Sequence, residues 1–138
     1  MRHNDWAERL NQFIKQHLNT PFKWGEFDCC LFPADAILAM TGVDYAAEFR
    51  GHYSTALGAK RALVKYGQGD IQQTITAKFG PMQPRLLAGR GDLVLIDTPF
   101  GTALGIVWAG KIWAPEESGL VTLPMRSALG CWEVPCHQ

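Results

Sequence analysis

Hydrophobic positions near the start of the chain recur at helical spacing. Between residues 5 and 18 they fall three or four positions apart, which predicts one amphipathic helix. Asn4-Asp5, followed by Glu8, resembles an N-terminal cap with its returning acid. The apolar positions of this helix are Trp6, Leu10, Phe13, Ile14 and Leu18.

A second helix is predicted to begin near Cys29 and to end at Gly42, since glycine is a common C-terminal cap. Pro33 fits this start because proline is tolerated only in or near the first turn of a helix. Only Asp35 and Thr41 interrupt the apolar run between these limits. A helix that is apolar on all sides is expected to be central and buried.

Residues 44–90 have the pattern of a helical insertion. One helix, capped by Ser54, is predicted to stop at Gly67. Asp70 with Gln73 can cap another helix. The apolar face of this last helix carries Ile71, Ile75 and Phe79.

From Gly91 the pattern changes to short apolar runs separated by turn residues, which predicts strands. Helices first and an antiparallel meander afterwards is the α+β pattern, and residues 1–138 are expected to form a single domain. The expected strands are 93–96, 103–108, 111–114, 119–123 and a short edge strand at 132–134.

Charge and composition exclude some classes of function. Thirteen basic residues balance thirteen acidic ones without a basic run, which argues against a nucleic-acid-binding protein. No apolar run approaches about 20 residues, and the N-terminus lacks a signal-peptide pattern. We therefore expect a protein made in the cytoplasm that does not insert into a membrane.

Cys29 is the candidate for chemistry. A thiol at the start of a helix lies at the positive end of the helix dipole, which favours the nucleophilic thiolate. Asp28 is a plausible cap for the same helix start. Two alternatives stay open: Cys29 can be a packing residue, and Cys30 can be the thiol that faces a cleft. Catalysis by either thiol needs a base nearby.

The two C-terminal cysteines are expected to be small packing residues. Cys131 and Cys136 are separated by four residues and precede His137, which is poor spacing for a zinc site. Without a secretion signal, free thiols are the expected state of all four cysteines. We predict no metal and no cofactor.

Four segments occur in an informative order: Pro21-Phe22-Lys23-Trp24-Gly25, Asp28-Cys29-Cys30, Gly91-Asp92-Leu93-Val94 and Ala103-Leu104-Gly105-Ile106-Val107. This order resembles the NlpC-type, papain-like cysteine hydrolases that cut peptidoglycan stem peptides. The resemblance implies a papain-like fold with Cys29 at the position of the nucleophile. The Trp-Gly-x-x-Asp-Cys spelling and the long insertion look most like small phage and prophage proteins from tail gene clusters.

The chain differs from the family at the positions of the catalytic residues. Ala103 occupies the position of the family's histidine base and cannot transfer a proton. Trp113 falls near the residue that would orient this histidine, and Phe22 replaces the tyrosine of the loop. His52, in the insertion, is the best substitute base, ahead of His3, His17 and His137.

Three functions follow from this comparison. The first is a structural phage-tail component that binds hub, tail-tip or baseplate proteins through exposed aromatics such as Trp108, Trp113 or Trp132, and that resides in the virion after synthesis in the host cytoplasm. The second is an active peptidoglycan endopeptidase, with Cys29 as nucleophile and His52 or a partner's residue as base. The third is redox or metal chemistry at the adjacent cysteines.

Overall fold

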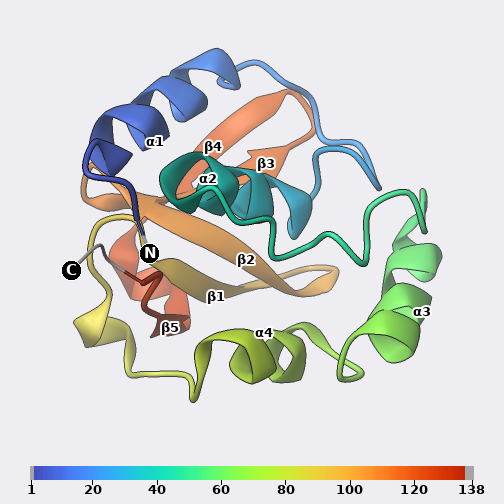
Figure 1. Cartoon of the computed structure of the whole chain (residues 1–138). Coiled ribbons are helices and arrows are strands. Elements are labelled where there is room, and N and C mark those ends of the chain that lie inside the picture. Colours follow the sequence, from blue (N-terminus) through green and yellow to red (C-terminus); the bar gives the residue numbers. More distant parts are fainter. Residues whose placement is uncertain (1, 136–138) are drawn as a thin grey trace.

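The chain forms helices first and an antiparallel sheet afterwards, as the α+β prediction requires (Figure 1). A computed structural model describes residues 2–135. The helices are α1 (Trp6–Gln16), α2 (Leu31–Thr41), α3 (Ala56–Tyr66) and α4 (Ile71–Phe79), with short 3-10 turns η1 (Arg85–Leu87) and η2 (Met125–Ser127). The strands are β1 (Leu93–Thr98), β2 (Gly101–Trp108), β3 (Lys111–Glu116), β4 (Gly119–Leu123) and β5 (Ala128–Trp132).

The five strands form one sheet in the order β4-β3-β2-β1-β5. Strands β1 to β4 are a meander, and β5 returns to pair antiparallel with the free side of β1. The edge strand expected at 132–134 is therefore Ala128–Trp132, and its predicted position was wrong by several residues. Beyond Trp132 the backbone leaves the ladder, because Val134 donates its N–H to the Asp92 carboxylate and accepts a hydrogen bond from Arg2.

Both faces of the sheet are covered by apolar side chains. One face packs against α1 and α2, and this cluster includes Leu10, Phe32, Leu95 and Ile106. As predicted, α2 is the most buried helix, with eight of its eleven residues buried. By contrast, α3 and α4 lie at the periphery (Figure 1), and Ala62 and Thr74 are their only buried residues.

The tryptophans expected at the surface contribute to the core instead. Trp132 is 1% exposed, and Trp108 and Trp113 are half-buried against the same cluster as α1 and α2. The prediction that these three rings form an exposed binding surface was therefore wrong. Successive side chains of a strand point to opposite faces of the sheet, and these three rings point to the face that packs against α1 and α2. Burial of a large ring is most favourable there.

The predicted helix ends are mostly confirmed. Gly42 ends α2 with a left-handed φ of 78°, and the Asp70 carboxylate accepts from the N–H of Gln73. The cap of α3 is Thr55 and not Ser54. Asp5 makes no cap hydrogen bond, because its carboxylate pairs with Arg9 one turn later.

Thr55→Ala is expected to lower the free energy of unfolding by about 1 kcal/mol, because the Thr55 hydroxyl accepts from the N–H of Gly58. Urea denaturation measures this change. Ser54→Ala is the matched control and should change stability by less than about 0.5 kcal/mol. An equal effect of the two substitutions would contradict this assignment of the cap.

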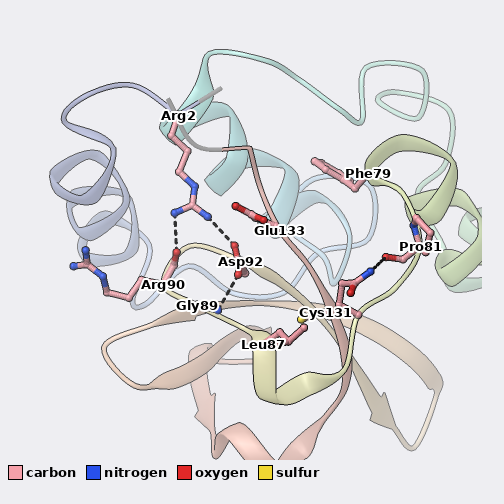
Figure 2. A pocket seen from close by; sticks show the side chains of 10 residues that line it. Arg2, Phe79, Pro81, Leu87, Gly89, Arg90, Asp92, Cys131 and Glu133 are labelled. Carbon is pink, nitrogen blue, oxygen red and sulfur yellow. Dashed lines mark hydrogen bonds and ion pairs between the residues drawn. The ribbon is translucent and has the colours of Figure 1, made fainter. Parts of the chain in front are cut away.

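A buried ion pair ties the N-terminal segment to the start of the sheet (Figure 2). Arg2 is 3% exposed and donates to the Asp92 carboxylate at 2.7 Å and to the carbonyls of Arg90 and Val134. Its guanidinium also lies 4.3 Å from the centre of the Trp6 ring. Asp92 accepts in addition from Gly89 N–H, so this aspartate does more than turn the chain into β1.

No helix in the part of the chain that the structure describes is long and apolar enough to cross a membrane.

Candidate functional site

The loop before α2 is organised around the buried carboxylate of Asp28, which is 0% exposed. One oxygen accepts from the N–H groups of Cys30 and Leu31, at 3.0 and 2.9 Å, and so caps α2 as predicted. The other oxygen accepts from Gly25 N–H at 2.9 Å and from the Tyr53 hydroxyl at 2.6 Å. Four hydrogen bonds therefore fix the segment that carries Cys29.

Gly25 brings this loop into close contact with the insertion. Its φ is +83°, and a side-chain Cβ at this position would lie 2.2 Å from the carbonyl oxygen of Tyr53. Only glycine allows both the backbone conformation and this approach. Tyr53 thus contacts the loop twice, through its backbone and through its hydroxyl.

Cys29 lies half-buried on the wall of a cavity of about 900 Å³. Its side chain packs against the second face of the sheet, in the cluster that contains Ala103 and Ala114. Both alanines are buried and also line the cavity. The wall around the Cys29 thiol is therefore apolar on the side of the sheet.

Cys30 lies next to Cys29 on the same cavity and contacts the first core cluster. A hydrogen bond with the Cys29 thiol and burial both raise the pKa of Cys30 well above its ordinary value, and the negative charge of Asp28 adds to this effect. Cys30 is consequently held as a neutral thiol at neutral pH. A raised pKa makes Cys30 a poor nucleophile.

Alkylation of Cys30 by iodoacetamide is expected to reach half of its maximal rate well above pH 8.5, the ordinary pKa of a thiol being about 8.5. Peptide mass spectrometry across a pH series measures this rate. In Cys29→Ala the midpoint should move to lower pH, because the first cause of the raised pKa is removed. An unchanged midpoint would contradict coupling between the two thiols.

The structure places no described histidine on this cavity. His52 is exposed, and its ring packs on Tyr66 with Nδ1 3.0 Å from the tyrosine hydroxyl. His17 hydrogen-bonds Thr20, and His3 lies beside Gly42. His137 and Cys136 lie outside the described residues. A role of His52 as base stays a prediction, and its position gives it no support.

Trp113 and Phe22, which occupy the positions of the family's orienting residue and loop tyrosine, pack against other apolar side chains. Trp113 donates its indole N–H to the carbonyl of Trp108 and faces the cluster opposite to that of Cys29. Phe22 packs edge-to-face on Trp24, with ring centres 4.9 Å apart, and both rings line the cavity. Neither position offers an acceptor that could orient a base.

The cysteine pair is a poor metal site. Ligand atoms of Asp28, Cys29 and Cys30 lie within 4.8 Å of one another. However, four donors already use the roughly four lone-pair sites of the Asp28 carboxylate, which leaves only two thiols for an ion. Structural zinc sites need four protein ligands. Cys131, in turn, is buried in the core as predicted.

Tyr53 is the site residue that the sequence does not reveal. Burial first, and its hydrogen bond to Asp28 second, raise its pKa far above the ordinary value. The hydroxyl is therefore a permanent donor to the carboxylate. Tyr53 lies 25 residues after Asp28 and belongs to no recognisable motif, so no local pattern points to it.

Comparison with known proteins decides the family. A profile described as "Domain of unknown function (DUF6950)" matches residues 1–134. The chain belongs to this family. No curated protein matches the chain. Among solved structures, the NlpC/p60 domain of the peptidoglycan hydrolase SagA is similar, with a TM-score of 0.59 and 17% identity over 92% of this chain and 97% of that one. The predicted NlpC-like, papain-type fold is thus confirmed for this member of the family.

Proposed function

We propose that this chain is a structural component of a phage or prophage tail, at the tail tip or baseplate, built on an NlpC-like fold without a working catalytic site. One observation carries the proposal. The cavity beside the Cys29 thiol is lined by Ala103 and Ala114 and, among the described residues, by no histidine.

The chemistry of thiol hydrolases explains why this matters. A positioned general base contributes roughly 10²–10⁴ to the rate, and a thiol without one cannot pass its proton on during attack. Ala103, at the position that the resemblance assigns to the base, is buried and apolar. The adjacent Asp28 carboxylate does not compensate, because it already accepts four hydrogen bonds.

A structural role requires surfaces for tail proteins. Several large apolar side chains are exposed outside the cavity wall, and clusters of such residues favour protein contacts. They lie on η1, on β5 and on the outer side of α3: Leu86, Leu87, Leu129, Leu57 and Val64. Hub, tail-tip or baseplate proteins are the proposed partners, and the virion is the proposed location after assembly in the host cytoplasm.

Purified particles of a phage that encodes this chain test the proposal. Mass spectrometry should find the protein in the tail, and deletion of its gene should remove tails or infectivity. Cys29→Ala particles should assemble and plate within about twofold of the wild type, since the thiol performs no chemistry. Absence of the protein from particles, or a tenfold loss of plating by Cys29→Ala, would count against the proposal.

A second function, peptidoglycan endopeptidase, is favoured by the position of Cys29 just before α2, on a cavity of about 900 Å³. In this case Cys29 attacks a stem-peptide carbonyl, and His52 or a residue of a tail partner acts as base. Purified cell wall is incubated with the protein, alone and with its tail partners, and cross-links are analysed by mass spectrometry. Products that disappear in Cys29→Ala would establish this function in place of the first.

A further inference from the structure

The cavity beside Cys29 is more extensive than a cleft for one scissile bond. It extends from the Phe22–Trp24 loop along α2 to the inner sides of α3 and α4, and it reaches the β1–β2 hairpin. Its volume of about 900 Å³ lies in the range of small-molecule sites, roughly 300–1,000 Å³. Aliphatic and aromatic side chains form most of the wall, among them Ile37, Phe49, Leu63, Ile75, Phe79 and Leu104.

Three hydroxyls within this wall already have hydrogen-bond partners. The Tyr53 hydroxyl donates to Asp28, and the Thr74 hydroxyl accepts from Gln68 N–H. The Thr98 hydroxyl donates to Gly101 and accepts from Phe100 N–H. Burying a polar group without a hydrogen-bond partner costs about 1–3 kcal/mol in proteins. The part of a ligand that enters the cavity is therefore expected to be apolar, unlike a stem peptide.

Charges on the rim are unevenly distributed. Lys60, from α3, is exposed and forms no ion pair within residues 2–135, whereas Lys78 is paired with Glu48. Glu116, at the end of β3, and Glu117, in the turn after it, contribute negative charge to another part of the rim. A ligand with one anionic group would place it at Lys60 and away from the two glutamates.

We propose that this cavity binds a long-chain aliphatic carboxylate, with the alkyl chain against the apolar wall and the carboxylate at Lys60. The mostly apolar wall, the hydrogen-bonded hydroxyls of Tyr53, Thr74 and Thr98, and the lysine at the rim that forms no ion pair within residues 2–135 all fit this class of ligand. The proposal does not depend on the tail assignment, because it concerns only the cavity.

Displacement of a fluorescent fatty acid from the whole chain measures binding. Affinity should rise about fourfold for each methylene added between octanoate and hexadecanoate, as expected when each group leaves water. Ala59→Trp, which fills the cavity from α3, should weaken hexadecanoate binding at least tenfold. Ala77→Trp, on the exposed side of α4, is the control and should change it by less than twofold.

Lys60 has its own test. Lys60→Gln should weaken hexadecanoate binding about two- to fivefold, the range for an exposed charge pair, and leave hexadecanol binding unchanged. Arg61→Gln removes a neighbouring charge that does not line the cavity and should have no effect on either ligand. Equal losses in Lys60→Gln and Arg61→Gln would overturn the proposed position of the carboxylate.

Cys29 provides a second readout, because its thiol lines the same cavity. Saturating hexadecanoate should slow alkylation of Cys29 about fivefold or more, and octanoate at the same concentration should not. Absence of displacement by any chain length below its micelle concentration, or binding that Ala59→Trp and its smaller substitute Ala59→Leu leave intact, would refute the proposal. So would binding of a tail protein in the cavity that fatty acid cannot displace.

Discussion

Replacement of Asp28 by alanine is expected to lower the free energy of unfolding by about 3–5 kcal/mol. The carboxylate is fully buried and accepts four hydrogen bonds, three of them from backbone N–H groups. Its removal leaves buried donors without a partner, and each costs about 1–3 kcal/mol. Urea denaturation monitored by tryptophan fluorescence measures the loss.

The control for this prediction is Asp70→Ala, which removes an exposed N-cap carboxylate with one acceptor bond to Gln73. It should cost only about 1 kcal/mol. Tyr53→Phe removes one of the four bonds to Asp28, and a double-mutant cycle with Asp28→Asn should give a coupling of about 1–3 kcal/mol. An Asp28→Ala loss no larger than that of Asp70→Ala would show that the loop does not depend on this carboxylate.

The contrast between Asp28 and Tyr53 shows what the sequence can predict. A cap acts over two or three residues, so the pattern of an aspartate before an apolar run was sufficient to predict it. The hydroxyl that completes the network comes from the insertion, and its contact depends on how α3 is placed relative to α2. Such a pair is specified by tertiary packing and not by local spacing.

The sheet gives the same lesson. Strands joined by short turns were predicted because alternation and turn residues are local signals, and β4 was predicted with its observed bounds. β5 was misplaced, because its partner β1 lies some 35 residues earlier and its end is set by side chains of Asp92 and Arg2. The apolar run that includes Trp132 does not by itself determine where the pairing of β5 with β1 ends.

For the candidate site, the family resemblance predicted the positions of the site residues but not the side chains that surround them. Cys29 lies in the turn just before α2, two residues ahead of the first helical residue, and the fold is that of NlpC/p60 domains. The extent of the apolar cavity could not be predicted, because its wall combines side chains from three helices, α2 to α4, with loops and the sheet. The interpretation of Ala103 as the lost base position rests on the resemblance, and its burial in the cluster against which Cys29 packs fits that interpretation.

The ion pair between Arg2 and Asp92 leads to the second large effect. Arg2→Met should lower the free energy of unfolding by about 3–5 kcal/mol, because it leaves a buried carboxylate without its counter-charge and removes donors to two backbone carbonyls. Arg9→Ala, which breaks the exposed pair with Asp5, is the control and should cost less than about 1 kcal/mol.

The pH dependence of Arg2→Met separates loss of charge from loss of packing. Burial raises the pKa of Asp92 above its ordinary value of about 3.9, and Arg2 opposes this shift. Without Arg2 the pKa should rise further, so the folded variant binds a proton more readily than the unfolded chain. Its stability should therefore increase, relative to the wild type, as the pH falls from 7 towards 4. Urea titrations at several pH values measure this difference, and a gap that stays constant would assign the loss to packing against Trp6 and to the two hydrogen bonds to backbone carbonyls.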